Sequence, residues 1–228
     1  MQKKILVVTA HPDDEAFGFG GTIAKYASIG VEIHVVCATR GEKGNGKGDL
    51  GKIREAELLR AADILGVTTV EFLNYTDGTL CNNFYHDVAA KIQRKIEEFK
   101  PQVVLTFDRG GVSGHLDHVF MSLVTTYVCR KFNKIKLFYV GEHQQVTSIF
   151  STFYYIFFPP GLTQESIDVT IDISQEWKTK VLAMKQHKSQ MSDVRKIVAI
   201  KRFVPKKEYY VAAFPKKTKT QTTDFFVY

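Results

Sequence analysis

The stretch Lys4-Ile5-Leu6-Val7-Val8-Thr9-Ala10-His11-Pro12-Asp13-Asp14-Glu15 joins an apolar, β-branched run to one histidine, one proline and three consecutive acids. The apolar run predicts a buried strand, and the residues after it, Ala16–Ile29, have the pattern of a helix. Three adjacent carboxylates repel one another unless a cation or several hydrogen-bond donors lie among them. The simplest cation for one histidine and one or two aspartates is a divalent metal, so the end of this strand predicts a metal site.

A second cluster of ligand-type residues follows another apolar run later in the chain. Gln102–Phe107 predicts a strand, and Gly114-His115-Leu116-Asp117-His118 comes after it and opens a helical pattern. Both clusters are thus expected at the carboxyl end of a strand and at the start of a helix.

Apolar runs alternate with helical patterns along most of the chain. Strands are expected at Lys4–Ala10, Val31–Thr39, Thr69–Leu73, Gln102–Phe107, Ile135–Val140, Ile167–Ile171 and Tyr209–Phe214. Helices are expected at Ala16–Ile29, Lys52–Leu65 with Gly66 as C-cap, Phe84–Lys100, His115–Lys131 and Gln175–Met191. This alternation indicates an α/β fold, a three-layer Rossmann-like sandwich with a mostly parallel sheet.

The order of the strands decides whether the two clusters meet. Right-handed crossovers favour the order 3-2-1-4-5 for the first five strands, with additional C-terminal strands. In this order the first and fourth strands are neighbours, and the winding direction reverses between them. Ligands of such sheets bind in the crevice at that point, so His11–Glu15 and His115–His118 should line it from its two sides.

Length and composition fit one domain. With 228 residues, 44% of them hydrophobic, the chain can bury one substantial core, so a single domain over residues 1–228 is expected, with a basic tail from about residue 215. Three cysteines without CxxC spacing indicate a reducing compartment. Since neither a signal peptide nor a membrane-spanning run is visible, we expect a cytoplasmic protein without a transmembrane segment, and a homo-oligomer stays open.

Two segments keep two readings each. Val146–Phe158 is rich in aromatic residues, as expected of a buried strand or helix, or else of an apolar lid beside the active site or a surface for an apolar substrate tail. Arg195–Tyr228 contains nine basic and two acidic residues and so carries the whole net charge of +7, as a solvated edge or as a surface for an anionic partner. Nucleic-acid-binding proteins carry a more widespread basic surface, so no nucleic acid partner is expected.

The spacing within the clusters indicates metal ligands. His11 and Asp14 are three residues apart, as are His115 and His118, and this spacing places side chains on one face. His11, Asp14 and His118 can therefore supply two nitrogens and one oxygen to a single ion. Three protein ligands leave a position open for water, which is typical of a catalytic zinc site and not of a structural one.

The other polar residues of the clusters can perform acid–base chemistry. Asp13 lies next to a ligand and is placed to take a proton from the activated water. His115 can face the same substrate atom, and Asp117 can orient His115 and keep it protonated. The N-termini of both helices favour a developing oxyanion.

Other classes of function compete with a metal hydrolase. Gly18, Gly20 and Gly21 look like a dinucleotide-binding loop, but such a loop begins directly after the strand, where this chain has acids that repel a pyrophosphate. We therefore expect these glycines to permit close packing of a helix on the sheet. A non-catalytic metal- or sugar-binding module stays open, although it has no need for both Asp13 and His115 beside the ligands.

Several motifs carry a resemblance to a known family: Ala10–Glu15, Thr39–Glu42, Arg54–Glu57, Leu65-Gly66, Asp77-Gly78, Gly114–His118 and His187–Gln190. On these residues the chain resembles the LmbE-like (PIG-L) de-N-acetylases. That family includes N-acetylglucosaminyl-phosphatidylinositol de-N-acetylases and the mycothiol and bacillithiol pathway deacetylases. The resemblance covers residues 1 to about 192, and Ala10–Glu15 and Gly114–His118 are specific in combination.

The resemblance implies a zinc hydrolase that removes the N-acetyl group from a small amino sugar of the N-acetylglucosamine type. By position, His11, Asp14 and His118 would be the metal ligands, Asp13 the general base and His115 the group that stabilises the oxyanion. Another divalent metal can replace zinc, and an amidase that acts on another N-acylated small molecule is the alternative activity.

The resemblance also implies contacts with the substrate. Arg54 and Asp77 match family positions that contact the sugar, and Arg40 is a further candidate. His187 and Gln190 are either part of the site or polar tethers of the late helix.

Overall fold

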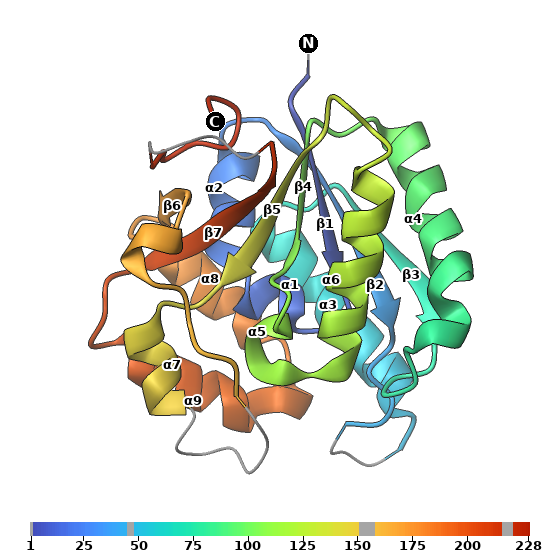
Figure 1. The fold of residues 1–228 in the computed structure, drawn as a ribbon. Coiled ribbons are helices and arrows are strands. Elements are labelled where there is room, and N and C mark those ends of the chain that lie inside the picture. Colours follow the sequence, from blue (N-terminus) through green and yellow to red (C-terminus); the bar gives the residue numbers. More distant parts are fainter. Residues whose placement is uncertain (1, 45–47, 151–157, 216–220) are drawn as a thin grey trace.

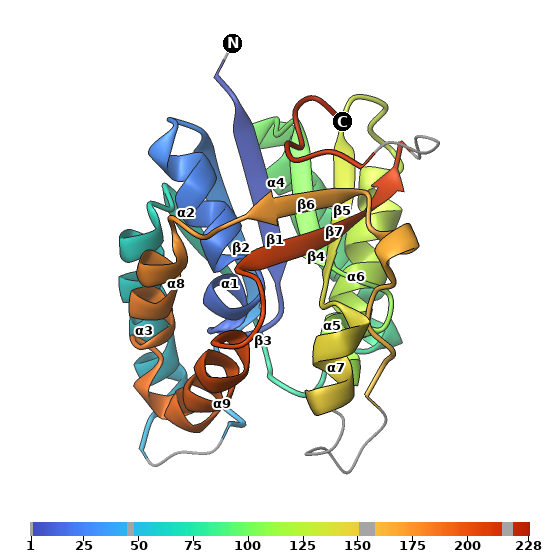
Figure 2. The ribbon, with the colours of Figure 1, turned by 90° about the vertical axis from the view of Figure 1, so that its left-hand side faces the viewer.

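The computed structural model describes residues 2–44, 48–150, 158–215 and 221–228 (Figures 1 and 2). Within them, one sheet has the strand order β3-β2-β1-β4-β5-β7-β6. Its strands are β1 (Lys4–Thr9), β2 (Glu32–Thr39), β3 (Thr69–Tyr75), β4 (Val103–Phe107), β5 (Lys136–Gly141), β6 (Val169–Asp172) and β7 (Lys207–Phe214). Strands β1 to β5 are parallel, whereas β7 runs antiparallel to both β5 and β6. The expected order 3-2-1-4-5 and the mostly parallel sheet are therefore confirmed.

Helices cover both faces of this sheet. One face carries α1 (Asp14–Phe17), α2 (Gly20–Ser28), α3 (Leu50–Leu65) and α8 (Trp177–Met184), and the other carries α4 (Tyr85–Phe99) and α6 (Leu116–Cys129) (Figure 2). Three further helices, α5 (Gly111–Gly114), α7 (Gln144–Phe150) and α9 (Met191–Lys201), lie beyond the carboxyl ends of the parallel strands (Figure 1). Short 3-10 turns occur at Asn82–Phe84, Gln164–Ser166 and Lys188–Gln190.

Strands β1 and β4 form the centre of the core. Their apolar residues Ile5 to Val8 and Val103 to Leu105 are at most 1% exposed, because helices cover both faces of the sheet. Cys37 and Cys129 are buried, as expected, and Cys81 is exposed; all three are free thiols. The crevice between the carboxyl ends of β1 and β4 is where the two sequence clusters meet.

The expected helix Ala16–Ile29 is two helices, because α1 ends at Phe17 and α2 begins at Gly20. The carboxylate of Glu208 on β7 accepts hydrogen bonds from the first-turn N–H groups of Gly21 (2.9 Å) and Thr22 (2.8 Å). A Cβ at Gly21 would lie 2.5 Å from Ile173, so this glycine permits the close packing expected from the sequence.

The late helix also differs from its expected range, Gln175–Met191. α8 ends at Met184, and α9, which the sequence did not predict, follows a 3-10 turn. The chain leaves the helix there because His187 and Ser189 bind α1 and α3, as described below.

The aromatic segment Val146–Phe158 is described only in part. It begins within α7, and residues 151–157 lie outside the described residues. Among the described helices, none combines the length and the apolar character that crossing a membrane requires.

A buried ion pair fastens β7 to the helical layer. Lys180 Nζ lies 2.5 Å from Glu208 Oε1 and donates to the carbonyl oxygen of Phe17 at 2.8 Å, and both charged side chains are at most 5% exposed. Burial alone would raise the pKa of Glu208, but the charge of Lys180 and the hydrogen bonds outweigh it and lower that pKa. The stabilisation is therefore present at neutral pH and is lost as the pH falls through this lowered pKa.

We expect Glu208→Ala to lower the free energy of unfolding by about 3–5 kcal/mol at neutral pH, because it leaves Lys180 charged, buried and without its carboxylate. Urea denaturation measures this change, and the difference from wild type should shrink in acid, where wild type loses the same interaction. The control Lys52→Ala, which removes an exposed pair with Asp49, should leave stability essentially unchanged. Equal stability of Glu208→Ala and wild type would contradict this account.

Candidate active site

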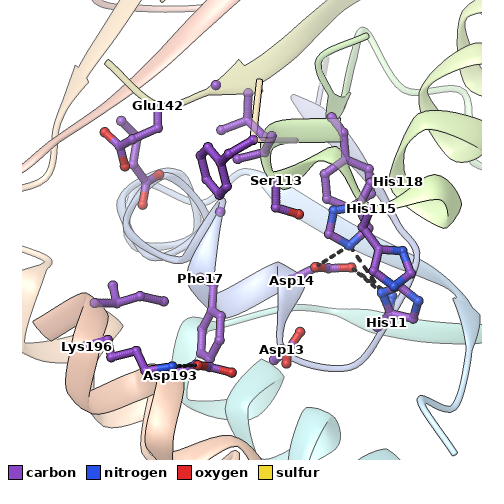
Figure 3. Close-up of a pocket in the computed structure, with 18 of the residues that line it drawn as sticks. His11, Asp13, Asp14, Phe17, Ser113, His115, His118, Glu142, Asp193 and Lys196 are labelled. Carbon is purple, nitrogen blue, oxygen red and sulfur yellow. Dashed lines mark hydrogen bonds and ion pairs between the residues drawn. The ribbon is translucent and has the colours of Figure 1, made fainter. Parts of the chain in front are cut away.

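A cavity of about 490 Å³ opens at the carboxyl ends of β1, β4 and β5 (Figure 3). At one end His11, Asp13 and Asp14 come from the turn after β1, and His115 and His118 come from the start of α6. The two clusters are thus brought together as expected from the strand order.

The polar atoms of three side chains, His11, Asp14 and His118, form a small triangle in this cavity. His11 Nδ1 lies 3.2 Å from His118 Nε2, His118 Nε2 lies 3.2 Å from Asp14 Oδ1, and His11 Nδ1 lies 3.8 Å from Asp14 Oδ2. Tetrahedral ligands at about 2.0–2.1 Å from an ion lie roughly 3.3 Å from one another. The two distances from His118 Nε2 therefore match those between ligands of one divalent cation.

Hydrogen bonds behind the triangle fix which imidazole nitrogens face it. His118 Nδ1 lies 3.0 Å from the carbonyl oxygen of Gly111, so Nδ1 is the donor and Nε2 presents its lone pair. His11 Nε2 lies 3.0 Å from Asp77 Oδ1 and 3.1 Å from Asp117 Oδ2, so its Nδ1 is the nitrogen that faces the triangle. Both rings are thereby oriented as ligands before any ion binds.

The electrostatics of the cluster favour positive charge. Burial disfavours the charged ring of His11, but Asp117, Asp77 and Asp14 outweigh burial and raise the pKa of His11 to about 10. Although burial opposes it, the neighbouring histidines lower the pKa of Asp14, whose Oδ2 also accepts hydrogen bonds from the backbone N–H groups of Ala10 (3.1 Å) and His11 (2.8 Å). Carboxylates that hold a proton on His11 hold a metal cation by the same attraction.

Asp13 stands beside the triangle in a strained conformation. Its φ of 116° and ψ of −29° lie in a region that costs a non-glycine residue on the order of 1–3 kcal/mol. Arg54 donates to Asp13 Oδ2 at 3.1 Å and to the carbonyl oxygen of Pro12 at 2.6 Å. Burial and the charge of Asp14 raise the pKa of Asp13 to about 7, against the lowering effect of Arg54. A carboxyl group with such a pKa can accept a proton near neutral pH.

His115 caps α6 and lines the cavity. Its Nδ1 accepts the backbone N–H of Asp117 at 3.2 Å, which leaves its proton on Nε2. Burial and the nearby His11 and His118 lower the pKa of His115, which disfavours the protonated ring that the sequence suggested.

The carboxylate of Asp117 also differs from the expectation, because it does not orient His115. Instead, it contacts His11 and accepts the backbone N–H groups of Gly78 (2.8 Å) and Leu80 (3.2 Å). The backbone of Asp117 already satisfies His115, and its side chain turns toward the loop after β3.

The three expected substrate contacts have different positions. Arg54 and Asp77 line the cavity, although Arg54 also pairs with Asp13 and Asp77 with His11. Arg40 does not line the cavity, so its expected contact is not supported. Its guanidinium instead binds Glu55 and Asn74, and it is partly exposed outside the site.

Sequence reasoning missed the far end of the cavity. Phe17, Glu142, Lys196, Lys201 and Tyr209 line it there, and Figure 3 shows Glu142, Phe17 and Lys196 at a distance from the imidazoles. Glu142 directly follows β5, and its position at a strand end was the available signal. Lys196 and Lys201 lie on α9, which the hydrophobic pattern did not reveal.

Comparisons with known proteins agree with the motifs. Residues 6–129 match the model of the family described as GlcNAc-PI de-N-acetylase (PIG-L). The chain is 31% identical to the 1D-myo-inositol 2-acetamido-2-deoxy-alpha-D-glucopyranoside deacetylase of Actinosynnema mirum, over 83% of this chain and 81% of that protein.

Solved structures give a similar result. The N,N'-diacetylchitobiose deacetylase from Pyrococcus horikoshii has a TM-score of 0.69 and 25% identity over 92% of this chain and 83% of that chain. GalB, the 4-carboxy-2-hydroxymuconate hydratase from Pseudomonas putida, has a TM-score of 0.74 and 21% identity over 96% of this chain and 99% of that chain, which shows a shared fold alone.

The triangle predicts one bound divalent cation per chain. His118→Ala should reduce the metal content of the purified protein to background, because it removes one of three donors. Asp117→Asn keeps the donors but weakens the support of His11, so metal affinity should fall by roughly 10- to 100-fold. Elemental analysis and competition with a chelator measure both effects, with the exposed Asp63→Asn on α3 as control. Undiminished metal in His118→Ala would reject His118 as a ligand.

Proposed function

Because this chain belongs to the PIG-L family of de-N-acetylases, we propose that it is a metal-dependent hydrolase that removes the N-acetyl group from an N-acetylglucosamine-containing substrate. The observation that carries this proposal is the triangle of His11, Asp14 and His118 with the carboxyl group of Asp13 beside it. Hydrolysis of an amide by water is catalysed by a metal ion that acidifies the water and by a general base that accepts its proton, and these residues can supply both.

The names of similar proteins narrow the class of substrate. The relative from Actinosynnema mirum is named for a 2-acetamido-2-deoxyglucoside of inositol, and the enzyme from Pyrococcus horikoshii is named for diacetylchitobiose. Both named compounds contain an acetylated amine on a glucose ring, and they differ in the group that is attached to that ring. We infer that the acetamido sugar is the shared part of the substrate here as well.

Zn²⁺ is the metal that we propose, since two imidazole nitrogens and one carboxylate oxygen form a typical donor set of catalytic zinc. Iron or another divalent metal can use the same donors. When bound, such an ion supplies Lewis-acid chemistry, because it acidifies water and polarises a carbonyl group.

Asp13 and His115, which lie beside the triangle, have different roles in the proposed reaction. Arg54 holds Oδ2 of Asp13, so Oδ1 is the atom that takes the proton from the attacking water. The Nε2–H of His115 donates a hydrogen bond to the oxyanion that develops on the acetyl group. Asp13 then passes its proton to the amine nitrogen as the C–N bond breaks, and acetate and the free amino sugar leave.

The alternatives differ from this proposal in substrate or in chemistry. An amidase for another N-acylated small molecule would use the same groups, and the similarity to GalB shows that this fold also carries a hydratase. A module that only binds a metal or a sugar gains nothing from a strained aspartate whose pKa is raised to about 7.

Release of acetate tests the activity and the substrate class together. N-acetylglucosamine, chito-oligomers and simple N-acetylglucosaminides should release acetate, and a chelator should abolish the release until metal is restored. N-acyl amino acids serve as the comparison substrates. Faster turnover of the N-acyl amino acids would favour the amidase, and no release from any compound would reject the proposed activity.

We expect Asp13→Asn to lower kcat by about two to four orders of magnitude, because it removes the general base while it preserves size. Metal content should stay at the wild-type level, since Asp13 is not one of the three donors. Asp63→Asn, an exposed change of the same chemistry on α3, provides the control. An Asp13→Asn enzyme with wild-type kcat would remove this residue from its proposed role.

A further inference from the structure

We propose that His187, on the segment between α8 and α9, is a positioning residue that holds Asp13 in its active conformation through Glu15. This inference rests on the proposed function, because it concerns the base of that reaction. It explains a motif whose role the sequence left open.

The first link joins Glu15 to the backbone of Asp13. Glu15 Oε2 accepts the backbone N–H of Asp13 at 3.0 Å, two residues back along the chain. Asp13 has a positive φ, and a non-glycine residue keeps such a backbone only where its surroundings hold it. Together with the contacts of Arg54 described above, the carboxylate of Glu15 supplies that restraint.

The second link joins Glu15 to His187. The other oxygen, Glu15 Oε1, lies 2.7 Å from Nε2 of His187, and both side chains are 0% exposed. A buried carboxylate oxygen that loses its donor has no water to replace it, so the carboxylate of Glu15 must rotate toward another donor. That rotation moves Oε2, the oxygen that holds the backbone of Asp13.

In the described part of the chain, the side chain of His187 has one polar contact, the contact with Glu15. Its Nδ1 is buried and has no hydrogen-bond partner among the described residues, so the contact with Glu15 is the polar interaction for which the ring is placed. Phe17, which lines the cavity, packs edge-on against the ring with centroids 6.1 Å apart. The arrangement thus connects a residue remote in sequence to the wall of the active site.

A neighbouring contact anchors the segment independently of Asp13. Ser189 donates from its backbone N (2.9 Å) and from its Oγ (2.6 Å) to the carboxylate of Glu57 on α3. Removal of the hydroxyl leaves the backbone hydrogen bond in place. Ser189→Ala is therefore a matched control, which perturbs the same segment and leaves the Glu15–His187 contact intact.

The test compares side chains at position 187 that differ in their ability to donate. His187→Phe keeps an aromatic ring without a donor, His187→Asn keeps an amide that is too short, and His187→Gln keeps a donor with the reach of Nε2. We expect the first two to lower kcat at least about tenfold with KM within about twofold and full metal content. His187→Gln should recover kcat to within about threefold of wild type, and Ser189→Ala should match wild type.

Crystal structures supply a readout that needs no substrate. In His187→Phe the Asp13 peptide should leave the positive-φ region, whereas in His187→Gln it should stay there. If wild type releases no acetate, the proposed function fails, and these structures still decide the inference.

Several results would overturn the inference. One is a wild-type kcat in His187→Phe, and another is an equal loss in His187→Gln. A loss that follows metal content, or an unmoved Asp13 in the His187→Phe crystal structure, would also reject it. Unfolding of both non-donor variants, with His187→Gln folded, would assign His187 to fold stability instead.

Discussion

The site depends on one electrostatic constraint, which is that two imidazole nitrogens and a carboxylate share a space of a few ångströms at the end of β1. His11 Nδ1 and His118 Nε2 face each other at 3.2 Å, and only a proton or a metal cation between them makes that approach favourable. Asp77 and Asp117 behind His11 and the carbonyl oxygen of Gly111 behind His118 keep both rings turned inward. Asp13 is buried next to Asp14, and burial and the negative charge of Asp14 raise its pKa.

The sheet is what makes this constraint possible. β1 and β4 are adjacent and parallel, so the turns after them open on the same edge, and His11 and His118 meet although they are far apart in sequence. Within β1 and β4, Ile5 to Val8 and Val103 to Leu105 are buried apolar residues. The proposed metal ligands lie in the segments that leave these strands, as is common where ligands bind at the reversal point of a parallel sheet.

Much of this could be predicted from the sequence, because the deciding signals were local. The apolar runs marked the strands, alternation marked the parallel sheet, and the spacing of His11, Asp14 and His118 marked the triangle. The failures came from contacts between distant residues. The break before α2 depends on Glu208, and the partner of Asp117 depends on how its backbone meets His115. Neither the helix break nor the partner of Asp117 can therefore be predicted from a short window of sequence.

The residues that support the site come from a different part of the chain than the proposed metal ligands. Glu208 contacts α2, and His187 contacts Glu15. The segment that matches the family model, residues 6–129, contains all three proposed ligands, whereas Glu208 and His187 lie outside it. Chimeric proteins that exchange the last third between relatives would therefore inherit a complete set of donor atoms yet lose the register of the neighbouring turn. In such hybrids Glu15 and His187 come from different parents and must be matched, whereas Lys180 and Glu208 are exchanged together.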